Sequence, residues 1–202
     1  MNKRKIAPGI FVVRFRSQYG VASTFLRFQE HYESSRFRNR VFSLEEFMDW
    51  YADRFGAFTY YEDWAGFNVP STAFADFYAG KFDPLLLKEQ RLLSLFRSEP
   101  QPFYVIGISK NVDLKHELAH ALFFTLPAYR AAVLAAMRRY DTSAIRKRLA
   151  AIGYHRAVLA DEVHAYLLSP SGTIKGTARR LAALRAELRS IYRRHAAGLR
   201  VD

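Results

Sequence analysis

Two histidines and a glutamate stand at a spacing that suits a metal-dependent hydrolase. His116, Glu117 and His120 form the pattern His-Glu-x-x-His. Residues four apart in a helix lie one turn apart on the same face, so both imidazoles can reach a single ion. Glu117, beside the first ligand, can reach a water bound to that ion. The pattern predicts a Zn²⁺ hydrolase in which zinc lowers the pKa of this water toward about 7 and the carboxylate takes its proton.

A third metal ligand must come from elsewhere in the chain, because a catalytic zinc usually has three protein ligands and one open position. The chain has no cysteine, which excludes Cys-ligated zinc fingers, iron–sulfur clusters, disulfide frameworks and a Cys nucleophile, and leaves His, Glu or Asp. Asp161, Glu162, His164 and Tyr166 interrupt an otherwise apolar helical stretch. In a helix Glu162 shares a face with Tyr166, whereas His164 points elsewhere.

From His116 to Tyr166 the sequence resembles the gluzincin type of zincin metallopeptidase, in which a glutamate on a second helix completes the His-Glu-x-x-His site. The resemblance implies Glu162 as the third zinc ligand, with Asp161 and His164 as competitors, and a peptide or protein substrate. Asp161 is otherwise a solvated residue or an acceptor for the N–H of a ligand imidazole. The third histidine and the glycine that metzincins carry after the second ligand are missing after His120.

A peptidase also needs a hydrogen-bond donor for the oxyanion of its tetrahedral intermediate. Some gluzincin endopeptidases place a tyrosine about seven residues before the ligand glutamate. Here His155 lies seven and Tyr154 eight residues before Glu162. A phenol and an imidazolium can both donate, so both residues are candidates.

The elements that must position these residues divide the chain into two halves. β-branched and aromatic runs predict strands at 10–15, 58–61 and 103–108. Helical spacing predicts helices at 21–34, 44–55, 71–78 and 84–96, the last with Pro84 in its first turn, and residues 64–70 are expected to form a loop. From about 111 to 200 the chain is rich in Ala, Leu and Arg and is expected to be entirely helical, with a helix start signal at 111–113 and breaks at Pro127, 141–142, Gly153 and 170–172. We therefore predict an α+β fold: a small N-terminal mixed β-sheet with helices, then a helical half that carries the His-Glu-x-x-His helix. One domain spans 1–202, with a soft boundary near residue 110.

Two further features have open interpretations. The strand at 103–108 is either buried or an edge strand, and zincins commonly bind peptides by main-chain pairing along such an edge. In that case Gly107 would permit close backbone approach. The aromatic group Tyr60, Tyr61, Trp64 and Phe67 either lines a cleft or packs in the core, and we favour the core.

Charge gives a weaker indication of partners. Lys and Arg number 31 against 19 Asp and Glu, a net charge of +12, and eight of these cations fall within residues 175–200. There Leu181, Leu184, Leu188 and Ile191 form an apolar stripe, with Arg185, Arg189 and Arg193 on another face. This predicts an amphipathic helix with a solvated basic face; the alternative is a docking surface for an acidic partner or nucleic acid, although no nucleic-acid-binding module is recognisable.

Composition and length limit the remaining classes. With 202 residues, half of them hydrophobic, the chain can build a sizeable core and is neither disordered nor fibrous. No apolar run reaches about 20 residues, so no membrane span is expected, and the N-terminus lacks a signal-peptide cleavage site, which predicts a cytoplasmic protein. Besides a peptidase, two hypotheses stay open: a metal-bearing regulator that acts on a nucleic-acid-associated partner, and a non-catalytic domain stabilised by its metal.

Overall fold

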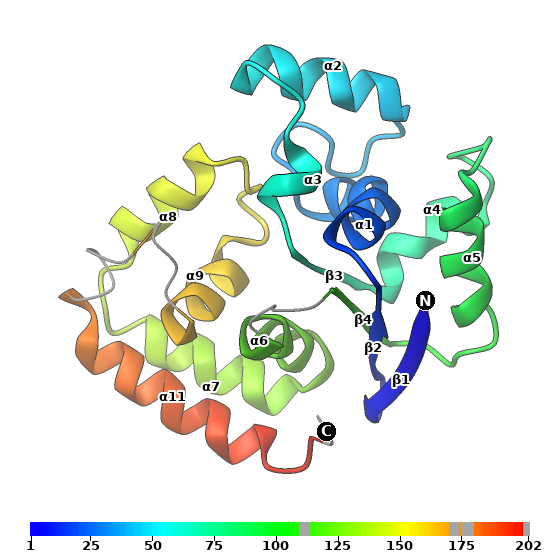
Figure 1. The fold of residues 1–202 in the computed structure, drawn as a ribbon. Helices are drawn as coiled ribbons and strands as arrows, with labels where there is room; N and C mark the ends of the chain where they lie inside the picture. The colour runs from blue at the N-terminus through cyan, green and yellow to red at the C-terminus, as the bar shows by residue number, and fades with distance from the viewer. Residues whose placement is uncertain (110–113, 170–173, 175–179, 200–202) are drawn as a thin grey trace.

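The structure is a computed structural model that describes residues 1–109, 114–169, 174 and 180–199. Figure 1 shows the chain order of its elements. They are β1 (Asn2–Ala7), β2 (Ile10–Arg14), α1 (Gln18–Glu33), α2 (Leu44–Phe55), α3 (Tyr60–Asp63), β3 (Gly66–Pro70), the 3₁₀ turn η1 (Ser71–Phe74), α4 (Ala75–Tyr78), α5 (Leu87–Phe96), β4 (Tyr104–Ile108), α6 (Leu114–Thr125), α7 (Pro127–Met137), α8 (Ser143–Ala151), α9 (Leu159–Leu168) and α11 (Ala182–Ala196).

Four strands form one mixed sheet in the order β1-β2-β4-β3. The central pair, β2 and β4, is parallel, with Val12 opposite Ile106. The outer pairs are antiparallel, and β3 places Asn68 opposite Ile106. The α+β fold with a small mixed N-terminal sheet, followed by a helical region, is confirmed.

Both faces of the sheet are covered by helices. Ile10 and Val12 on β2 belong to a core with α6, α7, α8, α9 and α11, whereas Phe11 and Val13 belong to a phenylalanine-rich core with α1, α2 and α5. Figure 1 shows these two groups of helices on opposite sides of the strands. Because both faces are buried, β2 and β4 appear in the sequence as continuous apolar runs without alternation.

Most predicted helices are confirmed, and their ends have identifiable causes. The side chain of Ser43 accepts a hydrogen bond from the Glu46 N–H at the start of α2, and Gly56 ends that helix in the left-handed conformation at φ 88°. In the second half every described element is a helix. The apolar stripe of α11 is buried through Leu184, Leu188 and Ile191, while the predicted break at 170–172 and the start signal at 111–113 lie outside the described residues.

Two local predictions in the first half are wrong. Residues 58–61 do not form a strand, because the N–H groups of Glu62 and Asp63 bond to the Thr59 carbonyl and close the short helix α3. Residues 66–70, predicted as part of a loop, form β3, since pairing with β4 outweighs the poor strand propensity of a Gly-Phe-Asn-Val-Pro segment. Helix α5 also starts three residues later than Pro84 suggested, at Leu87.

The edge strand β1 was not predicted either. The basic segment Asn2–Ala7 forms β1 at the edge of the sheet, where polar side chains are tolerated on an exposed strand.

No single helix among the described residues has the length and apolar character to cross a membrane. Helices α6 and α7 reach that length and apolar character only when taken together, and the pair is bent by 108°.

Candidate metal centre

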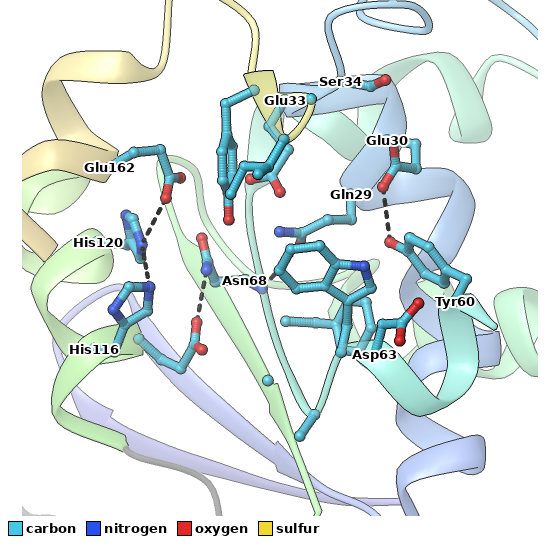
Figure 2. A pocket seen from close by; sticks show the side chains of 18 of the residues that line it. Gln29, Glu30, Glu33, Ser34, Tyr60, Asp63, Asn68, His116, His120 and Glu162 are labelled. Atoms are coloured by element: carbon cyan, nitrogen blue, oxygen red, sulfur yellow. Dashed lines mark hydrogen bonds and ion pairs between the residues drawn. The ribbon is translucent and has the colours of Figure 1, made fainter. Parts of the chain in front are cut away.

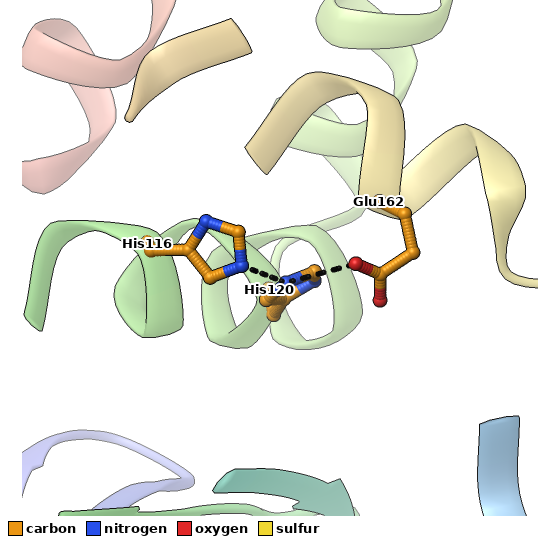
Figure 3. Close-up of side chains that lie close together, drawn as sticks. All are labelled: His116, His120 and Glu162. Atoms are coloured by element: carbon orange, nitrogen blue, oxygen red, sulfur yellow. Dashed lines mark hydrogen bonds and ion pairs between the residues drawn. The ribbon is translucent and has the colours of Figure 1, made fainter. Parts of the chain in front are cut away.

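Three predicted ligands lie together at the crossing of α6 and α9. His116 and His120 project from α6 and Glu162 from α9, and one ligand atom of each lies within 4.8 Å of the others (Figure 3). The Nε2 atoms of the two histidines are 3.3 Å apart, and His120 Nε2 is 3.8 Å from Glu162 Oε2. Within the described residues this is the one group of His, Asp and Glu with metal-binding spacing.

These distances and the state of the donors fit a tetrahedral ion. Metal–ligand bonds of about 2.0–2.1 Å at tetrahedral angles place ligand atoms about 3.4 Å apart. Glu162 Oε2 is buried without a hydrogen-bond partner, an arrangement that is costly unless something else binds the oxygen. Burial lowers the pKa of His120 to about 3, which keeps its imidazole neutral, as a metal ligand must be. The site therefore fits a divalent cation such as zinc.

The two competitors for the third ligand are placed outside this group. Asp161 Oδ1 lies 2.9 Å from His120 Nδ1, on the side of the ring opposite the ligand nitrogen, at an ion-pair distance but without hydrogen-bond alignment. His164 is fully buried, stacks on Phe123 with ring centroids 4.9 Å apart, and approaches Asp161 at 3.3 Å. Asp161 thus contacts a ligand imidazole, the arrangement that orients metal-bound histidines in proteins.

Glu117, the predicted general base, is fixed by the sheet. Its Oε2 accepts a hydrogen bond of 2.6 Å from Asn68 Nδ2 on β3, and the hydroxyl of Tyr104 on β4 donates to Asn68 Oδ1. The main-chain N–H of Asn68 donates to Gln29 Oε1 at 3.0 Å, so hydrogen bonds hold both the main chain and the side chain of Asn68. Asn68, Tyr104 and Gln29 were not among the predicted site residues.

The structure separates the two candidates for the oxyanion donor. Tyr154 lines the pocket, and its hydroxyl lies 3.2 Å from that of Tyr166, which also lines it. Burial, together with the nearby Glu162, raises the pKa of Tyr154 well above its usual value, so the phenol keeps its proton for donation. His155 is not among the lining residues, and its Nδ1 accepts a hydrogen bond from the Ala157 N–H. Of the two candidates, Tyr154 is therefore the one that the fold brings to the pocket.

The question of the edge strand is also answered. β4 pairs on both sides and cannot accept an added strand; the strand at the edge next to the site is β3. Gly107 on β4 permits a close approach, but by the ring of Phe25: a Cβ at this position would lie 2.4 Å from that ring. On β3 the Asn68 N–H already binds Gln29, so a peptide would find this donor occupied.

A pocket of about 780 Å³ extends from the metal ligands along β3 to helix α1 (Figure 2). Its α1 side carries Gln29, Glu30 and Glu33, none of which was among the predicted site residues. Burial raises the pKa of Glu30 to about 7 and that of Glu33 well above its usual value. Tyr60, Trp64 and Phe67 line the same pocket, and Tyr60 and Phe67 also pack in the phenylalanine-rich core, so both interpretations of that aromatic group apply.

The arrangement brings three residues that could hold a metal ion, a fixed carboxylate and a phenol to one cavity, a set of groups that can serve the metal-assisted hydrolysis of a carbonyl compound. Comparisons of the chain with protein-family models, curated proteins and solved structures give no match. The chemistry inferred for this site is therefore argued from its geometry alone.

Proposed function

We propose that this protein is a zinc-dependent metallopeptidase that hydrolyses peptide bonds with Glu117 as general base. One observation carries the proposal: His116, His120 and Glu162 present donors within 4.8 Å of one another, beside a carboxylate held by Asn68. A zinc ion at these donors would supply Lewis acidity and a bound water with a pKa near 7.

The residues of this chain then have distinct roles. Glu117 accepts the proton of the attacking water at its carboxylate and later passes it to the leaving amine. Asn68 keeps that carboxylate turned toward the pocket. Tyr154 donates its hydroxyl hydrogen bond to the oxygen that gains charge as the carbonyl is attacked. Asp161 stabilises the orientation of His120 from behind the ring.

A purely structural metal site is the second candidate, and two observations speak against it. Structural zinc is normally closed by four protein ligands, whereas the described residues contribute three to this group. Glu117 also lines the pocket although a structural site has no use for a base there. A nucleic-acid-associated regulatory role at the basic face of α11, and a cytoplasmic location, stay predictions.

The decisive variant is Glu117→Gln, which keeps the side chain's size but removes the base. We expect it to bind zinc like the wild type and to hydrolyse peptides at least about 10²-fold more slowly. A diverse peptide library read by mass spectrometry first supplies a substrate. Glu62→Gln, an exposed residue outside the pocket, is the matched control. Wild-type rates in Glu117→Gln, or no cleavage of the library by zinc-loaded wild type, would refute the proposal.

A further inference from the structure

The pocket is acidic although the chain is strongly basic. Among its described lining residues there is no lysine or arginine. Five of them carry carboxyl groups: Glu30, Glu33, Asp63, Glu117 and Glu162. The chain as a whole carries 31 Lys and Arg against 19 Asp and Glu. The ionisable side chains that line the pocket are thus acids, histidines and tyrosines, although Lys and Arg outnumber Asp and Glu in the chain as a whole.

Two of these carboxylates are not needed for the metal or for the base. Glu30 and Glu33 lie one turn apart on α1, and Figure 2 shows them on the wall of the pocket away from His116. Glu30 Oε1 accepts a hydrogen bond of 2.8 Å from the Tyr60 hydroxyl. Glu33 is only 8% exposed, and the side-chain amide of Gln29 hydrogen-bonds to it.

The same helix shows how the protein compensates a buried carboxylate elsewhere. Glu89 is 1% exposed, and Arg27 of α1 donates to both of its oxygens. In the described part of the chain, no lysine, arginine or histidine forms an ion pair with Glu30 or Glu33. A buried carboxylate without a cation is costly when ionised, and a cation brought by a ligand would offset that cost.

Aromatic rings complete this side of the pocket. Both tryptophans of the chain, Trp50 and Trp64, line it, together with Tyr51, Phe55 and Tyr60. Faces of such rings attract cations, most strongly when water is excluded. The guanidinium of Arg54 already lies over the Trp50 and Phe55 rings, 5.7 and 5.4 Å from their centroids, although Arg54 itself is not a lining residue.

We propose that this side of the pocket binds a positively charged group of the substrate, an ammonium or guanidinium, between Glu30, Glu33 and the aromatic wall. The inference rests on the proposed peptidase function and names its substrate class: peptides that carry a cation near the bond to be cleaved. The cation is the side chain of Lys or Arg or the free α-amine. A second metal ion is the less fitting occupant, because neither glutamate belongs to the group with metal-binding spacing.

The two tryptophans make the pocket observable without catalysis. Zinc-loaded Glu117→Gln is titrated with pairs of ligands that differ in one charge, and tryptophan fluorescence is recorded. N-acetyl-arginine amide against N-acetyl-citrulline amide tests a side-chain cation; norleucine amide against N-acetyl-norleucine amide tests the α-amine. We expect the charged member of at least one pair to bind at least about tenfold more tightly, as one charge-assisted hydrogen bond provides.

The glutamates are then tested individually. Glu30→Gln and Glu33→Gln should each reduce the charged-to-neutral affinity ratio by at least about fivefold and leave the affinity of the neutral ligand unchanged. Glu62→Gln, with the same loss of charge outside the pocket, should leave the ratio as it is. Circular dichroism and thermal melting establish that each variant is folded.

The results separate this inference from the proposed function. The ligand pairs measure binding in the pocket and not the reaction. The same titration on metal-free protein therefore tests the inference even if the chain proves not to be a peptidase. Three results would overturn the inference. The affinities could be equal within both pairs, neither charged ligand could bind, or both Gln variants could leave the charged-to-neutral affinity ratio unchanged.

Discussion

Asn68 Nδ2 donates a hydrogen bond of 2.6 Å to Glu117 Oε2 and so ties the edge strand of the sheet to the helix that carries the histidine pair. Because the Tyr104 hydroxyl donates to Asn68 Oδ1, the amide is oriented with its NH₂ group toward the carboxylate. The general base of the proposed reaction is therefore positioned by Asn68, a residue 49 positions earlier in the chain.

Asn68→Leu keeps the volume of the side chain and removes the donor. We expect zinc content to stay at the wild-type level while kcat falls about tenfold or more and KM changes little, because the base loses its fixed orientation. The check is zinc analysis and steady-state kinetics on the same preparation. In a Glu117→Gln background the substitution should cost no further activity; an equal loss there would show that Asn68 acts by another route.

Removal of either histidine should abolish metal binding. The wild type is expected to carry about one zinc per chain, and His116→Ala and His120→Ala should each lose it, since two remaining ligands hold the ion poorly. Elemental analysis after dialysis against a weak chelator measures this. Retention of zinc by both variants would mean that the ion binds elsewhere.

Asp161→Asn tests the contact behind His120. Outer partners of ligand histidines typically contribute about 10–100-fold to metal affinity, so zinc should bind this much more weakly while the fold is retained. Competition with a chromophoric chelator gives the affinity. The exposed Asp141→Asn serves as control, and an unchanged zinc affinity in Asp161→Asn would contradict the orienting role.

Glu30→Gln should change how stability depends on pH. The folded pKa of Glu30 is raised from 4.5 to about 7, so between these values the folded state binds more protons than the unfolded state and the wild type loses stability as pH rises. The variant cannot ionise at this position, so its free energy of unfolding should rise relative to that of the wild type across this window, by at most about 3 kcal/mol. Urea unfolding of metal-free protein at the two ends of the window provides the test; a difference independent of pH would contradict it.

Gly107→Ala should be destabilising although alanine suits a strand better. Its Cβ would lie 2.4 Å from the Phe25 ring, and overpacking of a core costs about 1–3 kcal/mol. Chemical denaturation measures the free energy of unfolding. Gly198→Ala, where nothing lies within 4 Å of the added Cβ, is the matched control and should be nearly neutral.

The parts of the site that the sequence predicted are those encoded by local spacing. His116 and His120 are one helical turn apart, and Glu162 lies on a helix whose apolar face must be buried against α6. Local signals also placed α2, because Ser43 and Gly56 act within a few residues of the helix ends they define. Such features need no knowledge of the rest of the fold.

The features that were missed depend on contacts between distant parts of the chain. β3 is a strand because β4 pairs with it, and its own Gly and Pro argue against that conformation. Asn68 became part of the site only through this pairing. Glu30 and Glu33 were not predicted as site residues, because only the position of α1 beside the pocket brings them to its wall.

Two main-chain hydrogen bonds join the end of α1 to the loop before α9 beside the pocket. Ser35 N–H donates to the Gly153 carbonyl and His155 N–H to the Glu33 carbonyl, both at 2.7 Å. These bonds join segments separated by more than a hundred residues, so they exist only when the two halves of the chain are docked. The protection of the Ser35 and His155 amide hydrogens against exchange with solvent deuterium should therefore report the free energy of separating these two segments, which makes them probes of pocket opening in the absence of any ligand.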